Sequence, residues 1–222
     1  MSERTDAMSE PIEAVAFDFD GTLADTHHAI QATMAQTFVD FAVEPLAPER
    51  IATMIGLPLH RIFSEAGIAS DAVERAVVRY REIFPGNLAR VVLFPGVIEC
   101  LRALSEAGLL LGIVSSRGRV SLLDLLERLQ IRPLFREVLG DEDVVGKKPA
   151  PDFVLRLSER LAVPPASVLV VGDTTYDIEM GHAAGARTCA VTYGSHDALR
   201  LATVRPTFAL DSLADLYRLL SR

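Results

Sequence analysis

The sequence lacks any apolar run long enough to cross a membrane, and it lacks any stretch dense in basic residues. A bilayer-spanning helix needs roughly 18 or more consecutive apolar residues. The formal net charge is −8, and an acidic chain without a basic face is a poor partner for nucleic acid or for an anionic membrane surface. We therefore expect a protein that binds neither nucleic acid nor membrane.

Cysteine is also scarce, because only Cys100 and Cys189 are present, in apolar contexts that form no metal-ligand pattern. Two buried, reduced thiols are typical of a cytoplasmic protein, and we expect a cytoplasmic location. The first ten residues are polar and contain no apolar segment of the kind found in signal peptides. We predict a disordered tail over residues 1–11.

Lysine is nearly absent, since the 22 basic residues comprise 20 arginines and the adjacent pair Lys147 and Lys148. A general preference for arginine explains the larger group, but it does not explain why both exceptions fall together. The pair therefore marks a candidate functional position. The rest of the composition is ordinary for a globular enzyme, with 50% hydrophobic and 23% charged residues.

Short apolar runs alternate with helical segments over most of the chain, which predicts an α/β fold with a parallel, doubly wound sheet. The predicted strands are residues 14–17, 109–114, 138–139, 168–171, 188–192 and 208–210. Residues 26–90 differ, because their apolar side chains recur only at helical spacing, with breaks at residues 56–58 and 85–86. We predict a core domain of residues 12–25 and 91–222, with residues 26–90 inserted as a small helical cap domain.

Two carboxylates follow the first predicted strand. Asp18 and Asp20 lie on the same side of an extended segment, because side chains alternate. One can attack phosphorus while the other handles the proton of the leaving oxygen. Solvated acids in a strand-end turn would give the same pattern, so the pair alone does not decide between the two interpretations.

Asp173 and Asp177 follow a later apolar strand. Because ligands of such sheets bind beyond the carboxyl ends of the strands, we expect both acids to lie near Asp18. Several carboxylates in one place repel each other unless a cation lies among them, and a hard oxygen site suits Mg²⁺. Asp177 alone is equally explained as an acid favoured by a helix N-terminus.

Ser115 and Lys148 are expected at the same edge of the sheet. The Ser115 hydroxyl and the backbone N–H of Ser116 can donate hydrogen bonds to a phosphoryl oxygen, although a helix-capping pair would look the same. Lys148, directly before Pro149, offers a compact positive charge to a nucleophile and a transferring phosphoryl group. The alternative is a solvated lysine in a loop.

Together these segments resemble the haloacid dehalogenase-like (HAD) superfamily in order and spacing, from residue 12 onward. The matching segments are Asp18-Phe19-Asp20-Gly21-Thr22-Leu23-Ala24-Asp25-Thr26, Ser115, Lys148-Pro149-Ala150-Pro151-Asp152, and Val171-Gly172-Asp173-Thr174-Thr175-Tyr176-Asp177-Ile178 with Ala183-Ala184-Gly185. The departure is Ser115-Ser116-Arg117, where many relatives have Asn after the hydroxyl residue. The role of Arg117 is left open.

The resemblance implies a Rossmann-like core and a role for each matching residue. Asp18 would be the nucleophile and a Mg²⁺ ligand, while Asp20 would be the general acid and then the base, with its backbone carbonyl on the metal. Ser115 and Lys148 would hold the phosphoryl group. The metal site would be completed by two further acids, Asp173 as a ligand and Asp177 in support. In this superfamily, the helical block is a mobile cap that excludes water and selects the substrate.

Within the superfamily, Asp20 argues against a dehalogenase, since that reaction has no leaving alcohol to protonate. Residues 26–90 contain no lysine, which disfavours a phosphonate hydrolase that needs a cap lysine for a Schiff base. Residues 55–59 and 94–97 look most like the phosphoglycolate phosphatase group. We therefore expect an enzyme that hydrolyses a small-molecule phosphate monoester with Mg²⁺, through an aspartyl-phosphate.

A sugar-phosphate mutase and a catalytically silent relative that binds a phosphate or a partner are the alternatives. Arg61, which follows the break at residues 56–58, is our candidate for binding a second anion of the substrate through two parallel hydrogen bonds. A surface arginine on a helix would give the same pattern. The sequence carries no indication of the oligomeric state.

Overall fold

The computed structural model describes residues 10–221, so most of the predicted tail lies outside the described part of the chain. Glu10, near the end of that predicted tail, contacts the sheet. The backbone carbonyl of Glu10 accepts a hydrogen bond from Arg187 Nη2 at 2.6 Å, and its side chain accepts one from Ser167 Oγ at 3.4 Å. The disorder predicted for residues 1–11 stays a prediction.

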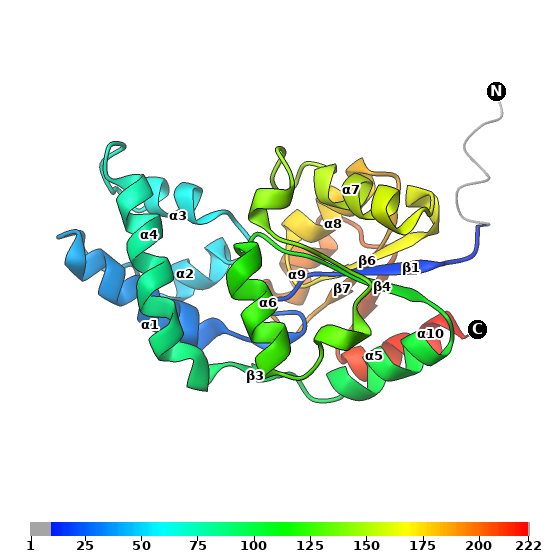
Figure 1. Cartoon of the computed structure of the whole chain (residues 1–222). Coiled ribbons are helices and arrows are strands. Elements are labelled where there is room, and N and C mark those ends of the chain that lie inside the picture. Colours follow the sequence, from blue (N-terminus) through cyan, green and yellow to red (C-terminus); the bar gives the residue numbers. More distant parts are fainter. Residues whose placement is uncertain (1–9, 222) are drawn as a thin grey trace, which may run out of the picture.

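The core of the structure is a six-stranded parallel sheet with the strand order β5-β4-β1-β6-β7-β8, which confirms the predicted α/β class (Figure 1). Its strands are β1 (Ala14–Phe17), β4 (Leu110–Val114), β5 (Glu137–Leu139), β6 (Val168–Gly172), β7 (Arg187–Val191) and β8 (Phe208–Leu210). The first strand of the chain lies in the middle, with Ala14 opposite both Leu110 and Val168. Each boundary lies within one residue of its predicted position.

Helices cover both faces of the sheet, as a doubly wound fold requires (Figure 1). The helices of this part are α5 (Val97–Glu106), α6 (Arg119–Arg128), α7 (Asp152–Leu161), α8 (Thr175–Ala183), α9 (Ala198–Ala202) and α10 (Leu216–Leu220), with short 3₁₀ turns at Arg132–Leu134, Asp141–Asp143, Pro165–Ser167 and Leu213–Asp215. Along β1, Val15 and Phe17 join the core cluster that includes α5 and α6, whereas Ala14 and Ala16 join that of α7. The strand is hence apolar throughout, because both of its faces are buried.

Residues 26–90 form a helical group beside the sheet (Figure 1), which we call the helical insert. Its helices are α1 (His27–Asp40), α2 (Pro48–Met54), α3 (Leu59–Glu65), α4 (Val73–Ile83) and the 3₁₀ helix η1 (Phe84–Arg90). The predicted break at residues 85–86 does not end the helical path, because the chain passes from α4 directly into η1. Edge-to-face pairs of Phe38 with Phe63 and of Phe63 with Tyr80 form the centre of the insert.

The two chain crossings between insert and core are held together by a two-stranded antiparallel ribbon that the sequence did not reveal. It consists of β2 (Ala24–Asp25) and β3 (Val92–Leu93), with Ala24 opposite Leu93. Two residues are too few to show the alternation that identifies a strand. Among the helices of residues 10–221, none combines the length and apolar character that a membrane crossing requires.

Candidate active site

The predicted site residues converge at one edge of the sheet, beyond the carboxyl ends of its three central strands. Asp18 follows β1, Ser115 follows β4, and Asp173 follows β6. The backbone hydrogen bonds of the sheet continue through Asp18 and Ser115. The Asp18 N–H donates to the Val171 carbonyl at 2.9 Å, and the Ser115 N–H donates to the Leu139 carbonyl at 3.0 Å. Their positions are therefore fixed by the sheet itself.

A buried ion pair joins Asp18 to Lys148. Lys148 Nζ lies 2.9 Å from Asp18 Oδ1 and 2.7 Å from Asp177 Oδ1, and both Asp18 and Lys148 are only 2% exposed. The second oxygen of Asp18, Oδ2, is buried without a hydrogen-bond partner in the protein. Burial of a carboxylate oxygen without a hydrogen-bond partner costs free energy, which indicates that Oδ2 binds a group from outside the chain.

Burial and charge oppose each other at this pair. Burial raises the pKa of Asp18 well above its ordinary range, and the positive charge of Lys148 counteracts only part of that effect. For Lys148, burial lowers the pKa, but the carboxylates of Asp177 and Asp18 outweigh burial and raise the pKa above its ordinary value. Lys148 is therefore a fixed positive charge at neutral pH.

Asp173 is held by donors from two other loops. Its Oδ1 accepts a hydrogen bond from Thr22 Oγ1 at 2.8 Å, and its Oδ2 accepts one from the Ser195 N–H at 2.6 Å. Burial, followed by the nearby charge of Asp177, raises the pKa of Asp173 to about 6. Gly21 packs so closely, at φ +83°, that a Cβ there would collide with Asp173 Oδ2.

Asp177 caps a helix and also contacts Lys148, while its predicted support of a metal site stays a prediction. It closes a capping box at the start of α8, where its Oδ2 accepts hydrogen bonds from the Thr174 N–H at 3.1 Å and from Thr174 Oγ1 at 2.6 Å. Its other oxygen binds Lys148. The helix cap thereby fixes the direction of the lysine side chain.

Asp18, Asp173 and Asp177 each offer a carboxylate oxygen, and these atoms lie within 4.8 Å of one another. Lys148 is the one cation paired with this cluster among the described residues. The uncompensated negative charge and the unpartnered Asp18 Oδ2 fit a hard divalent cation, for which carboxylate oxygens are the preferred ligands.

Arg117 is the site residue whose role the sequence left open. Its Nη2 and Nε donate hydrogen bonds to Asp20 Oδ1 at 2.7 Å and Oδ2 at 3.0 Å, and its guanidinium carbon lies 4.2 Å from the ring centroid of Phe84 in the insert. Burial lowers the pKa of Arg117, but the charge of Asp20 more than offsets this and raises it. The available signal was its position three residues after the end of β4, at the edge of the sheet where the other candidate site residues lie.

The two serines after β4 have different contacts. Ser115 is buried, and its Oγ accepts a hydrogen bond from the Arg117 N–H at 3.2 Å. Ser116 Oγ instead donates to the carbonyl of Gly56 at 2.7 Å, which connects the core to the helical insert. The predicted contact of the Ser116 N–H with a phosphoryl group stays a prediction.

Arg61 is not brought to the other site residues. Its Nε pairs with Glu65 Oε1 at 2.7 Å, one helical turn away, and its side chain is 55% exposed. The structure thus corresponds to the surface alternative for this arginine.

Lys147 also points away from Asp18 and Asp177, because its Nζ donates to the backbone carbonyls of Asp141 and Val144. Only one lysine of the pair reaches the site.

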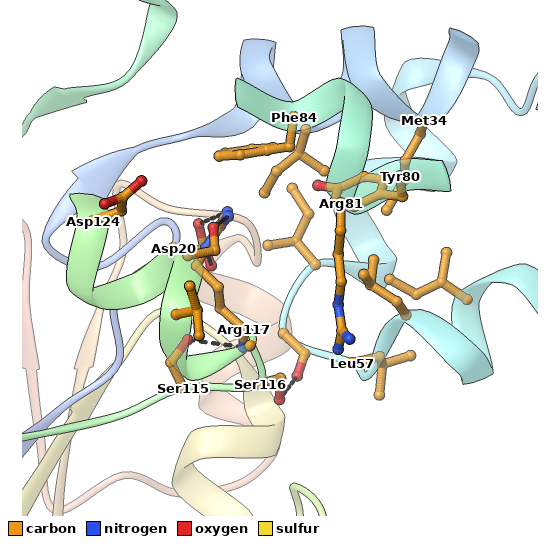
Figure 2. A pocket seen from close by; sticks show the side chains of 18 of the residues that line it. Asp20, Met34, Leu57, Tyr80, Arg81, Phe84, Ser115, Ser116, Arg117 and Asp124 are labelled. Carbon is orange, nitrogen blue, oxygen red and sulfur yellow. Dashed lines mark hydrogen bonds and ion pairs between the residues drawn. The ribbon is translucent and has the colours of Figure 1, made fainter. Parts of the chain in front are cut away.

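A cavity of about 420 Å³ lies between the helical insert and the core, and its lining includes Asp18, Asp20 and Ser115. Figure 2 shows Asp20, Ser115, Ser116 and Arg117 on the core side of this space. The side chains of the insert lie opposite. Of the acids near the strand ends, Asp18 and Asp20 line this space, where a small molecule could contact them.

The candidate site is thus a strand-end aspartate paired with a buried lysine, beside a helical insert, in an α/β protein. Over residues 15–191 the chain matches the family described as haloacid dehalogenase-like hydrolase, and it belongs to that family. The family and the Rossmann-like core inferred from the motifs are thereby confirmed, and the chain is an enzyme.

Among its relatives are phosphoglycolate phosphatases. The one from Shigella boydii is 32% identical over 232 residues, which cover 93% of this chain and 92% of that protein. The one from Salmonella typhimurium is 32% identical over 230 residues, covering 92% of this chain and 91% of that protein. A solved structure from Bacteroides fragilis, described as haloacid dehalogenase-like, is 28% identical, covers 92% of this chain and 99% of that chain, and superimposes with a TM-score of 0.87.

Proposed function

We propose that this enzyme is a Mg²⁺-dependent phosphatase that hydrolyses a small-molecule phosphate monoester through an aspartyl-phosphate on Asp18. One observation carries the proposal. Asp18 lines the cavity, its Oδ1 lies 2.9 Å from Lys148 Nζ, and its Oδ2 has no hydrogen-bond partner in the protein. A carboxylate held this way is oriented for attack on an incoming phosphorus atom.

In the first step, a carboxylate oxygen of Asp18 forms a bond to phosphorus while the bond from phosphorus to the ester oxygen breaks. Asp20, which lines the same cavity, gives a proton to that leaving oxygen, so the product departs as a neutral alcohol. Lys148 and Ser115 stabilise the negative charge that is spread over the phosphoryl oxygens. Asp18 is left as a mixed anhydride with phosphate.

In the second step, water attacks phosphorus and the anhydride bond to Asp18 breaks. Asp20, now a carboxylate, takes a proton from the attacking water, which restores both acids and releases inorganic phosphate. The bidentate pair with Arg117 holds the Asp20 carboxylate in one plane, toward the space that the water enters.

The proposed Mg²⁺ site consists of Asp18, Asp173 and Asp177, together with the backbone carbonyl of Asp20. A divalent cation supplies positive charge for the phosphoryl oxygens and neutralises the repulsion among the acids. Residues 26–90 would act as the mobile cap that excludes water from the anhydride. The contacts that opening of this cap would break include Ser116 to Gly56, Arg117 to Phe84 and Arg81 to Glu142.

Phosphate release from an aryl phosphate, with and without Mg²⁺, tests the proposal. A phosphatase releases phosphate continuously and only with the metal. A sugar-phosphate mutase would release little phosphate from the aryl ester and would instead isomerise a sugar phosphate offered in its place, and a silent relative would do neither. Phosphoglycolate, which the names of the relatives contain, is the first metabolite to compare.

A further inference from the structure

The helical insert gives the active-site cavity an apolar wall. The insert side chains that line it are aliphatic or aromatic with the exception of Arg81, and they include Ile30, Met34, Leu57, Ile62, Tyr80 and Phe84. In Figure 2, Met34, Leu57, Tyr80 and Phe84 lie opposite the catalytic side chains of the core. The leaving group of a bound ester, which projects away from phosphorus, would lie against this wall.

Each cation of the lining already faces an acid of the core. Arg117 pairs with Asp20, and Arg81 lies 3.5 Å from Glu142 on the core side. Counted over the lining, two arginines stand against four acids, which are Asp18, Asp20, Asp124 and Glu142. With Arg61 outside the cavity and Arg117 already paired, a second anion on the substrate would face Asp124 and Glu142 and would lose its water without gaining an unpaired cation.

The volume of the cavity also favours a substrate with an apolar leaving group. Its volume of about 420 Å³ falls within the range of about 300–1,000 Å³ that is typical of sites for drug-sized ligands. A two-carbon acid such as glycolate would leave most of the apolar wall in contact with water. A longer apolar group would bury that wall, and burial of apolar surface is favourable.

We infer that this cavity selects phosphate monoesters with an apolar leaving group, of alkyl or aryl type, over esters that carry a second anion such as phosphoglycolate. The inference rests on the proposed phosphatase activity for the reaction, and on the lining of the cavity for the preference. Asp124 and Glu142, two acids that line the cavity from the core, further disfavour a substrate with a second anion.

A series of n-alkyl phosphates tests the preference, because ethyl, butyl and hexyl phosphate differ in apolar length and hardly in the basicity of the leaving alcohol. The specificity constant kcat/KM should rise up to about fourfold for each added methylene group. Phosphoglycolate should give a lower kcat/KM than ethyl phosphate, its closest match in length. A flat series, with phosphoglycolate the best substrate, would overturn the inference.

A matched pair of variants locates the effect. Leu59 lines the cavity and is partly buried, so Leu59→Lys places a cation on the wall without emptying the core. This variant should flatten the alkyl series and raise kcat/KM for phosphoglycolate. Arg61→Ala, two residues away but outside the cavity, should change neither. Equal effects of the two substitutions would contradict the assignment of the wall.

Binding measurements separate this inference from the phosphatase proposal. Hexylphosphonate and phosphonoacetate cannot be hydrolysed at an ester bond, so calorimetric titration of the Mg²⁺-supplemented enzyme reports affinity alone. Tighter binding of hexylphosphonate supports the preference for an apolar leaving group, even if no ester releases phosphate. That combination of results would overturn the phosphatase proposal alone. Tighter binding of phosphonoacetate would overturn the inference while leaving the phosphatase proposal intact.

Discussion

Arg117 donates hydrogen bonds to both carboxylate oxygens of Asp20, with N–O distances of 2.7 and 3.0 Å. The side chain of Arg117 is 7% exposed and that of Asp20 is 12% exposed. Removal of one partner from such a pair leaves the other charge buried and uncompensated, which typically costs about 3–5 kcal/mol. We therefore expect Arg117→Met to lower the free energy of unfolding by about 3 kcal/mol in urea denaturation.

The double variant Arg117→Met with Asp20→Asn should recover most of that loss, because no unpaired charge remains. The coupling between the two substitutions then exceeds about 1 kcal/mol in a double-mutant cycle. Additive effects would show that the pair contributes orientation but no stability. Arg117→Lys should not substitute for arginine, since an ammonium group cannot form the planar, two-point contact.

The adjacent lysines provide an internal control. Lys148→Ala removes the fully buried ammonium between Asp18 and Asp177, and we expect kcat/KM to fall at least about 100-fold, as for the loss of one charge-stabilising donor. Lys147→Ala removes contacts to loop carbonyls and should leave activity nearly unchanged. Circular dichroism of both variants checks that they are folded. Comparable losses from the two would remove Lys148 from the reaction.

The sheet and its site edge could be predicted because they depend on local patterns. Strands buried on both faces, such as β1 and β6, are continuous apolar runs, and parallel strands end at one edge. The sequence alone therefore predicts that Asp18, Ser115 and Asp173 lie together, as the structure has them. For the adjacent lysines, the proline after Lys148 is the one feature of the sequence that distinguishes Lys148 from Lys147.

Contacts that depend on loop conformation were not predictable. Ser195 reaches Asp173 because the loop after β7 folds back over Gly21, and nothing in a single sequence indicates that path. The surface position of Arg61 has a similar origin. Helical periodicity tells which face of α3 is apolar, but it does not tell how the insert is turned relative to the core.

Metal binding should depend on pH through Asp173. Its pKa is raised from 3.8 to about 6, so its neutral form stabilises the metal-free fold below pH 3.8, and this contribution is lost as the pH rises through about 6. Mg²⁺ binds the ionised carboxylates, and it should raise the melting temperature more at about pH 7.5 than at about pH 5.

Asp173→Asn is the control for this experiment, because it removes the titrating group while keeping the hydrogen-bonding shape. The variant should show little stabilisation by Mg²⁺ at either pH, and EDTA should have little effect on its melting. An equal Mg²⁺ effect at both pH values in the unmodified enzyme would mean that the acid cluster is not the metal site.

The most direct test of the proposed reaction is chemical trapping of the aspartyl-phosphate. Enzyme mixed with Mg²⁺ and an aryl phosphate is quenched in acid during turnover and reduced with borohydride, which converts an acyl phosphate into an alcohol. Peptide mass spectrometry should then find homoserine in place of Asp18, and Asp18→Asn should give no product and no turnover. Turnover without modification at Asp18, or an active and folded Asp18→Asn, would contradict the account.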